Sequence, residues 1–201
     1  MTGRKMRVGC VVLAAGRSER FGANKLCYML RGIPVLRRTL DALPADRLAA
    51  VIPVVSCAET EQICLDAGLT PVRYAGGPVS DSIRQGLHVL PDTDGCLFVN
   101  GDQPLLRTET VLTMLDLFER EPAAVIRASF RGQPGSPVLF PAAAFPALEA
   151  LRGENGGRRV IAEGGYRVIP AEVSGEREML DVDTPEDMAR AENGPDGGSG
   201  L

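Results

Sequence analysis

The 201-residue chain is long enough for one large domain or two small ones, and its 44% of hydrophobic residues can fill a sizeable core. Its 22 Lys and Arg against 26 Asp and Glu give a net charge of −4. That balance argues against a non-specific nucleic-acid binder, since such proteins carry a basic surplus. Aromatic residues make up 4% and Trp is absent, so stacking platforms for bases are not expected either.

The five cysteines include no CxxC pair, so neither a disulfide framework nor a zinc site is expected. A reducing cytoplasm fits this usage best. Basic residues before the first apolar run faintly resemble a signal peptide, but charged residues follow that run at once, which makes secretion the less favoured alternative. No stretch approaches the length needed to span a bilayer, so no membrane partner is expected.

The first 121 residues predict a strand followed by a helix, four times over. The strands are expected at residues 6–14, 49–56, 70–74 and 96–100. The helices are expected to open at Pro34, to cover 59–67, to start at a cap on Ser80 or Asp81, and to cover 108–121. This rhythm predicts an α/β fold, a three-layer α/β/α sandwich around a mostly parallel, Rossmann-like sheet.

The rhythm changes after Pro122. Strands are expected at 123–127, 136–140 and 166–170, with a turn or short hairpin at 129–133 and helices at 142–152 and 158–163. A short extended piece at 179–183 leads to a last helix, with Thr184 as its N-cap and Pro185 in its first position. Without any repeat or linker, we expect a single domain over residues 1–193 and a disordered tail at 194–201.

The most informative stretch is residues 11–25, VVLAAGRSERFGANK, in which a buried strand runs into a loop. Ligands of parallel α/β sheets bind at the carboxyl ends of the strands. Gly16 and Gly22 allow close backbone approach, and the cations Arg17, Arg20 and Lys25 suit a polyphosphate. The spacing matches neither a Walker A loop nor GxGxxG. On this pattern alone, the alternative is an ordinary strand and turn with scattered surface arginines.

Two acidic motifs follow, and the first is expected at the same edge of the sheet as this loop. In FVNGDQP, residues 98–104, Asp102 lies at the end of an apolar strand. A carboxylate beside phosphate-binding cations is best explained as a Mg²⁺ ligand. In LDVDTPED, residues 180–187, Asp181 and Asp183 alternate on an extended segment and point to one side. Taken alone, the first motif also fits an Asx turn and the second fits helix capping.

Together these motifs resemble the molybdenum cofactor cytidylyltransferase family, within the nucleotidyltransferases of GT-A-like fold. LAAGRSERFG with Lys25 resembles the signature LAAGxSxRxG…K, residues 101–104 resemble GDxP, and residues 183–187 resemble (D/N)TPED. The resemblance covers about residues 8–193. It implies Mg²⁺-dependent transfer of CMP from CTP to the terminal phosphate of the molybdopterin cofactor, with release of pyrophosphate.

The resemblance also implies which residues form the site. Arg20 and Lys25 would be catalytic by holding the developing negative charge, and Asp102 and Asp183 would hold the metal. The nucleotide-binding residues that it implies are Leu13, Ala14, Ala15, Gly16, Arg17, Ser18, Gly77, Ser80 and Ser82. The acceptor-binding residues that it implies are Gly135, Ser136, Pro137, Asn155 and Arg158.

Further segments bear on the two substrates. Residues 76–86 resemble the segment that frames the base, and residues 132–140 and 151–161 resemble the GxPxxF and LxGDxGxR segments of the acceptor pocket. Glu154 stands where the family usually has Asp, which weakens a direct role for it. Arg84 reads either as a phosphate contact or as an exposed helix arginine. His88, the only histidine, is expected to be structural, so the substrate would supply the nucleophile.

The expected partners are CTP and the molybdopterin cofactor, with a molybdoenzyme or its chaperone as recipient of the product. The chain reads LAAG where the guanylyltransferase branch typically reads LAGG, and Ala15 should crowd a purine. One alternative is a cytidylyl- or guanylyltransferase for a polyol phosphate, sugar phosphate or phospholactate. Another is a non-catalytic nucleotide-binding or cofactor-carrier module, against which Arg20, Lys25, Asp102 and Asp183 together argue.

Overall fold

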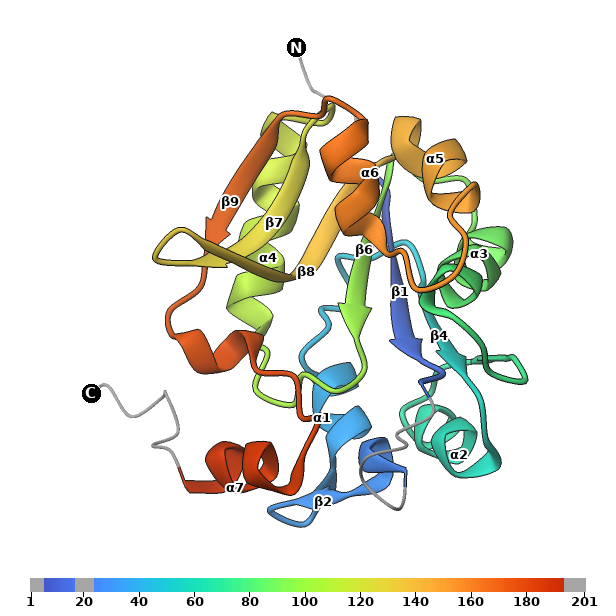
Figure 1. Cartoon of the computed structure of the whole chain (residues 1–201), viewed down its shortest axis with the longest axis vertical. Helices are drawn as coiled ribbons and strands as arrows, with labels where there is room; N and C mark the ends of the chain where they lie inside the picture. The colour runs from blue at the N-terminus through green and yellow to red at the C-terminus, as the bar shows by residue number, and fades with distance from the viewer. Residues whose placement is uncertain (1–5, 17–23, 194–201) are drawn as a thin grey trace.

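The computed structural model describes residues 6–16 and 24–193, and a mixed sheet lies at the centre of this part of the chain (Figure 1). The seven strands have the order β5-β4-β1-β6-β8-β7-β9. β8 runs antiparallel to both of its neighbours, whereas every other pairing in the sheet is parallel. The strands are β1 (Val8–Ala14), β4 (Val51–Val55), β5 (Val72–Arg73), β6 (Gly95–Asn100), β7 (Val125–Phe130), β8 (Gln133–Pro141) and β9 (Val168–Glu172).

Helices cover both faces of the sheet, which confirms the predicted three-layer sandwich (Figure 1). One face packs against α3 (Val79–Val89), α5 (Phe145–Glu149) and α6 (Gly157–Glu163). The other packs against α1 (Val35–Asp41), α2 (Ala58–Asp66), α4 (Thr108–Arg120) and α7 (Pro185–Asn193). None of the helices in the described ranges has the length and apolar character needed to cross a bilayer.

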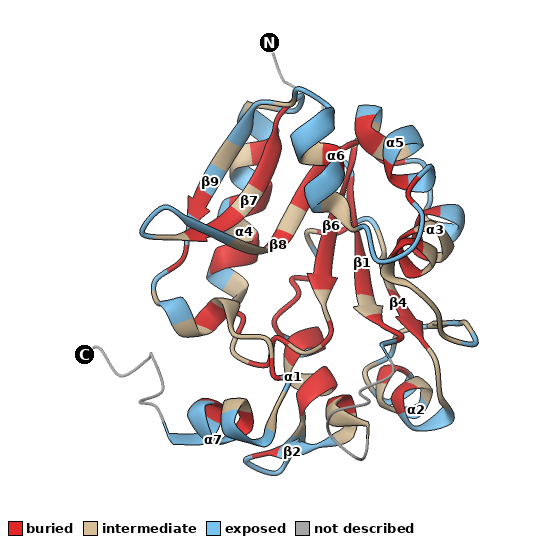
Figure 2. Cartoon of the chain, viewed as in Figure 1, coloured by how far each residue is buried: buried red, intermediate tan, exposed pale blue. Residues whose placement is uncertain are grey.

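Strand β1 is buried on both faces, as its nearly unbroken apolar sequence predicts (Figure 2). Cys10 and Val12 face the core on the α4 side, whereas Val11 faces the core on the α3 side. Helix α3 lies close to this strand because residue 86 is a glycine. A Cβ at Gly86 would stand 2.4 Å from Cγ1 of Val11. The central strand is therefore held from both sides, and its carboxyl end has a fixed position.

Short elements complete the described chain. A small antiparallel pair, β2 (Met29–Leu30) and β3 (Ile33–Pro34), precedes α1. Three 3₁₀ turns lie between the larger elements: η1 (Lys25–Cys27), η2 (Ala142–Ala144) and η3 (Glu176–Met179). The first of these turns carries Lys25, and the last leads into the segment that carries Asp181 and Asp183.

Several boundaries differ from the prediction. β7 continues to Phe130, and the hairpin turns at Arg131 and Gly132, whose φ angles are +50° and +79°, because Ser129 and Phe130 still pair with β8. The helix expected at 142–152 is only the 3₁₀ turn η2 followed by the five-residue α5. Pro78, not Ser80 or Asp81, is the N-cap of α3. The last helix does begin as predicted, since Oγ1 of Thr184 accepts a hydrogen bond from the amide of Asp187.

All five cysteines are free thiols. Cys10 and Cys96 are fully buried, as their apolar surroundings in the sequence predict, and burial raises the pKa of both thiols. Cys10 and Cys96 are therefore small core residues.

Candidate active site

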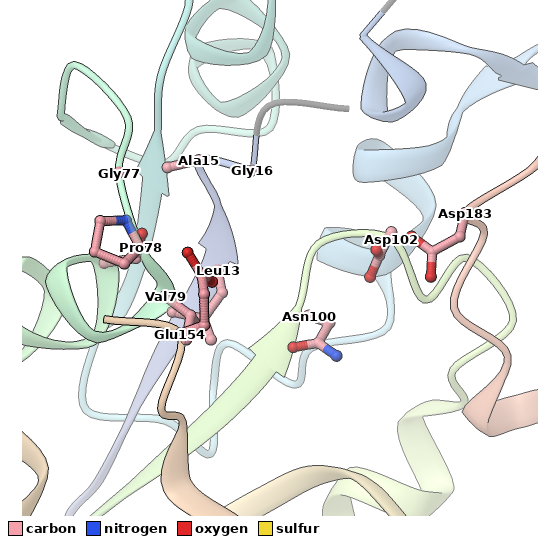
Figure 3. Close-up of a pocket in the computed structure, with 11 residues that line it drawn as sticks. Leu13, Ala15, Gly16, Gly77, Pro78, Val79, Asn100, Asp102, Glu154 and Asp183 are labelled. Carbon is pink, nitrogen blue, oxygen red and sulfur yellow. The ribbon is translucent and has the colours of Figure 1, made fainter. Parts of the chain in front are cut away.

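A cavity of about 770 Å³ opens at the carboxyl ends of β1 and β6, within the size range of small-molecule sites (Figure 3). Its two sides differ in charge. The wall near α3 is uncharged and consists of Leu13, Ala15, Gly16, Gly77, Pro78, Val79 and Ser82. Asp102 and Asp183 lie together on the far side, with Asn100 between them and the uncharged wall (Figure 3). Glu154 also lines the cavity.

Lys25 joins the two aspartates. Its ammonium donates to Oδ2 of Asp102 and, over 2.6 Å, to Oδ1 of Asp183. The side chains of Lys25 and Asp102 are only 13% and 16% exposed, whereas that of Asp183 is 55% exposed. Two carboxylates that lie far apart in the sequence therefore share one cation. This is the proximity of Asp102 and Asp183 that the sequence predicts.

Burial and charge act in opposite directions on this cluster. Burial disfavours the charged ammonium of Lys25, but attraction to Asp102 and hydrogen bonds to both aspartates outweigh it and raise the lysine pKa. For Asp102, burial outweighs the attraction of Lys25, so the pKa of this carboxyl is raised. Burial and the charge of Asp102 also raise the pKa of Asp181, to about 6. Negative charge is thus concentrated here, with Lys25 as a shared counter-ion.

Hydrogen bonds hold together the end of β6, helix α1 and the segment that carries Asp181 and Asp183. The amide of Val182 donates to the carbonyl of Asp102 over 3.0 Å, which places the C-terminal segment against the end of β6. Asn100 Nδ2 donates to Oδ1 of Asp181 over 3.3 Å. Thr39 Oγ1, buried in α1, donates to the carbonyl of Gly101 over 3.1 Å. The acidic cluster is therefore built into the fold instead of resting on surface side chains.

The uncharged wall is positioned by a second set of contacts. Tyr74 Oη donates to Oδ2 of Asp81 over 2.8 Å, and Arg84 donates to the other carboxylate oxygen. A Cβ at Gly77 would stand 2.3 Å from the tyrosine oxygen, so only glycine lets the loop lie against Tyr74. Arg84 therefore helps to hold the loop before α3, and the interpretation of Arg84 as a phosphate contact has no support from this geometry.

The donor set fits a hard divalent cation. Asp102 Oδ1 is buried and has no hydrogen-bond partner within the described residues, and the other Asp102 oxygen converges with Asp183 on the Lys25 ammonium. The described residues form no group of three His, Cys, Asp or Glu side chains that could hold a metal. Mg²⁺ needs no such cage, since it binds one or two carboxylates together with water and substrate phosphates.

A second cavity, of about 380 Å³, adjoins the first, and Leu13, Val79 and Asn100 line both. Gly135, Ser136 and Arg158, three of the residues expected to bind the acceptor, line this second cavity. Its remaining lining residues include Arg127 and Asp181. The site therefore offers two connected compartments, one beside the acidic cluster and one beside the β7–β8 hairpin.

Four of the described residues that were expected to bind the nucleotide or the acceptor line neither cavity, for different reasons. Ala14 points into the core on the opposite face of β1, because successive strand residues alternate. Ser80 and Pro137 are buried, and the Ser80 amide donates to the carbonyl of Gly153. Asn155 is exposed and donates to the carbonyl of Arg152 over 2.9 Å. The expected nucleotide and catalytic residues Arg17, Ser18 and Arg20 lie outside the described residues.

His88, which was expected to be structural, is exposed near the end of α3 and lines another cavity with Arg84, Gln85 and Glu149. Some residues that line the first two cavities were not predicted. Asn100 follows from the same strand-end argument that found Asp102. The discounted Glu154 lies in the first cavity, so the longer side chain does not exclude it from the site.

A sequence model of the family described as "MobA-like NTP transferase domain" matches residues 10–168. The chain belongs to this MobA-like family. It is a nucleotidyltransferase enzyme, as its motifs predict, with a fold shared by solved nucleotidyltransferases. The cavity at the ends of β1 and β6, with Asp102 and Asp183 in its lining and Lys25 bound to both, is therefore the candidate site for this chemistry.

Relatives of the MobA-like chain carry different names. It is 31% identical to the purine catabolism protein PucB of Bacillus subtilis (strain 168), over 90% of this chain and 94% of PucB. It is 27% identical to the molybdenum cofactor guanylyltransferase of Rhodobacter capsulatus, over 94% of this chain and 96% of that protein. Over 57% of this chain and 55% of the relative, it is 32% identical to a 2-C-methyl-D-erythritol 4-phosphate cytidylyltransferase of Porphyromonas gingivalis.

Among solved structures, the chain is similar to Rv0371C from Mycobacterium tuberculosis H37Rv in complex with manganese. The TM-score is 0.74 at 25% identity, over 92% of this chain and 98% of the other. Nucleotidyltransferases of this fold typically use divalent metals, which agrees with the donor set around Asp102.

Proposed function

We propose that this nucleotidyltransferase transfers CMP from CTP to the terminal phosphate of the molybdopterin cofactor and releases pyrophosphate. The observation that carries the proposal is the pair of connected cavities on either side of Asn100, with Lys25, Asp102 and Asp183 at the edge of the larger one. The larger cavity would hold the nucleotide and the smaller one the acceptor. Mg²⁺ is the metal that we propose for Asp102 and Asp183.

In this reaction the acceptor supplies the nucleophile. A phosphate oxygen of the acceptor would attack the α-phosphorus of CTP in line, and the bond from that phosphorus to the bridging oxygen would break. The electron pair leaves with pyrophosphate. No side chain has to remove a proton, because a phosphate monoester is largely ionised at neutral pH. This fits a site whose cavity walls contain no histidine within the described residues.

Lys25 would meet the negative charge that grows on the α-phosphoryl oxygens and the leaving pyrophosphate. Arg20, outside the described residues, is proposed as the second cation of this kind. When bound, Mg²⁺ would screen the triphosphate charge and orient its oxygens. Asp102 and Asp183 would bind the metal, and Asn100 would orient Asp181 through their 3.3 Å hydrogen bond.

The preference for CTP rests on the uncharged wall. Ala15 is buried in the wall and belongs to the lining, and its methyl group would limit the space at the end of the cavity where a base would lie. The Ser82 hydroxyl, on α3, is available for the polar edge of cytosine. Exclusion of a purine by one methyl group contributes ~1–3 kcal/mol to the preference for CTP. Polar groups that the wrong base leaves unpaired add to this preference.

Three further points belong to the proposal. Residues 1–193 would form a single domain, since strands from β1 to β9 join one sheet. The enzyme would work in the cytoplasm, where five free thiols persist. A molybdoenzyme or its chaperone would receive the product.

The experiment is pyrophosphate release with Mg²⁺ and each of the four ribonucleoside triphosphates, with and without molybdopterin. We expect kcat/KM for CTP to exceed that for GTP by ~10-fold or more. A preference for GTP, the nucleotide named in the guanylyltransferase relatives, would overturn the base assignment. Turnover of CTP only with a polyol phosphate, sugar phosphate or phospholactate would overturn the acceptor assignment.

A matched pair of variants tests the wall. Ala15→Gly restores LAGG and should shift the ratio of kcat/KM values towards GTP by ~5- to 10-fold. Ala14→Gly removes a methyl group from the opposite face of the same strand, so it should leave that ratio unchanged. Equal ratios in the wild type and both variants would show that residue 15 does not select the base.

A further inference from the structure

The second cavity contains two arginines from elements that are distant in the sequence. Arg127 belongs to β7, and Arg158 belongs to α6. Within residues 6–16 and 24–193, neither guanidinium forms an ion pair with a carboxylate, although arginines elsewhere, such as Arg167 with Glu121, do so. Two positive charges therefore face one cavity without compensation from the described protein groups.

Arg127 lies in an otherwise apolar part of the sheet. It stands in register with Val138, which stands in register with Phe98, so the three side chains form a row across β7, β8 and β6. Val138 and Phe98 also line the second cavity. A half-buried cation in such a row is costly unless a partner satisfies it. The strand sequence VIRASF thus places a charge where packing alone would favour an apolar residue.

One contact fixes the direction of the Arg127 side chain. Its Nε donates to the carbonyl of Gly135 over 2.9 Å, beside the register shift between β7 and β8. This bond uses one of the five N–H donors of the guanidinium. Burial lowers the pKa of Arg127, and the positive charge of Arg158 lowers it further, as expected of two cations close enough to repel each other.

The chemistry that relieves this repulsion is a dianion with several acceptor oxygens. A phosphate group fits, because the guanidinium binds phosphate through parallel hydrogen bonds and screens its charge. Asp181 lines the same cavity but is hydrogen-bonded to Asn100, at the border with the nucleotide cavity. The arginines and Ser136 therefore offer an anion donors on the rest of the cavity lining, within the compartment that adjoins the nucleotide cavity.

We propose that Arg127 and Arg158 form a binding subsite for a phosphate group of the acceptor, and that Arg127 makes the enzyme selective for phosphorylated acceptors. The inference rests on the proposed function in one respect, namely that the second cavity takes the acceptor. It deepens that function by assigning a role to Arg127, a residue that the sequence motifs do not single out.

A direct binding experiment uses inorganic phosphate as the probe, with the first cavity occupied by a non-hydrolysable CTP analogue. The ¹⁵Nε signals of the arginines are followed by NMR, and the Arg127 signal is identified by its absence from Arg127→Lys. We expect phosphate to move the signals of Arg127 and Arg158. The Kd should rise ~10-fold or more in Arg127→Gln and in Arg158→Gln, and less in Arg127→Lys.

Arg167→Gln is the matched control, because it removes an arginine charge from an exposed ion pair next to β9. Its phosphate Kd should stay within about two-fold of wild type. If the Gln variants bind phosphate as tightly as wild type, or if the Arg127 signal does not move, the subsite does not exist. Should Arg127→Gln fail to fold, Arg158→Gln decides the outcome, since Arg158 is exposed.

Kinetics separate this inference from the proposed function. With molybdopterin as acceptor, Arg127→Gln should raise the acceptor KM by ~10-fold or more and leave the KM for CTP unchanged. An unchanged acceptor KM would contradict the inference. If wild type does not turn over molybdopterin although phosphate binding depends on Arg127, the proposed function fails and the subsite remains. If molybdopterin is turned over but phosphate binding does not depend on Arg127, the subsite does not exist and the proposed function remains.

Discussion

Replacing Lys25 with methionine removes the cation that Asp102 and Asp183 share while keeping most of the side-chain volume. At 2.6 Å and an effective dielectric constant of about 20, a unit-charge pair such as Lys25 and Asp183 attracts by about 6 kcal/mol before desolvation is counted. Solvent screens Asp183, whose side chain is 55% exposed, so this pair contributes less than about 1 kcal/mol net.

Asp102 dominates the effect on stability. Its side chain is 16% exposed, and a buried carboxylate that loses its cation destabilises a fold by roughly 3–5 kcal/mol. Nearby solvent and proton uptake by Asp102, whose pKa burial already raises, reduce this cost, whereas repulsion from Asp183 adds to it. We therefore expect the metal-free Lys25→Met variant to lose about 2–4 kcal/mol of unfolding free energy. Added Mg²⁺ or Mn²⁺ should restore part of the loss, because the metal no longer competes with an ammonium for the same oxygens.

Activity should change in the opposite sense to metal affinity. We expect Lys25→Met to bind Mn²⁺ more tightly than wild type. Its kcat should nevertheless fall by on the order of 10²-fold, because no ammonium stabilises the negative charge that develops in the transition state. The assays are denaturant unfolding with and without metal, Mn²⁺ titration by electron paramagnetic resonance, and pyrophosphate release. Lys25→Arg should retain more activity than Lys25→Met, since it keeps the charge.

Arg37→Met provides the control, because it breaks the surface pair of Arg37 with Asp41 and should change unfolding free energy by less than about 1 kcal/mol. The reasoning would be refuted by wild-type kcat in Lys25→Met. Weaker Mn²⁺ binding in that variant would show that the ammonium and the metal do not compete for the carboxylates.

The remaining predictions concern other parts of the fold. Asp102→Asn should abolish most of the stabilisation that Mn²⁺ gives in thermal unfolding, and wild-type metal stabilisation would exclude Asp102 as a ligand. Thr184→Ala should lower Tm by roughly 2–4 °C, because it deletes the cap that accepts from the Asp187 amide, and an unchanged Tm would show that the cap is dispensable. Gly86→Ala should cost about 1–3 kcal/mol in urea unfolding, since the new Cβ would meet Val11, and a neutral result would show that α3 can move away.

The architecture could be predicted because periodicity and strand-end chemistry act locally. Local sequence patterns predicted these elements: the apolar run of β1, the capping residues around Thr184 and the four strand–helix repeats. The proximity of Asp102 and Asp183 was predicted on another ground, because the family resemblance implies that both carboxylates hold one metal ion. The observed contacts through Lys25 agree with that prediction.

Side-chain direction within a motif could not be predicted in the same way. Ala14 and Ala15 are neighbours in the same signature, but they pack in the core on opposite faces of the sheet, and only Ala15 also lines the cavity. Asn155 belongs to the expected acceptor segment, yet its side chain donates to the carbonyl of Arg152 within the same loop. A motif specifies which backbone approaches the site, and packing then decides which side chains line it.

The sequence also did not show where charged side chains from distant segments lie in the fold. Arg127 resembles one more surface arginine until the register with Val138 places it on the face that lines the second cavity. The sequence likewise did not show that His88 lies on the exposed side of α3.

The most direct test of the central claim follows the phosphorus atoms of CTP. The enzyme is incubated with Mg²⁺, molybdopterin and CTP labelled with ³²P at either the α or the γ position. The account predicts that the α label appears in the acceptor product and the γ label in pyrophosphate. Transfer of the γ label to the acceptor, or its release as inorganic phosphate without an α-labelled product, would contradict nucleotidyl transfer at this site.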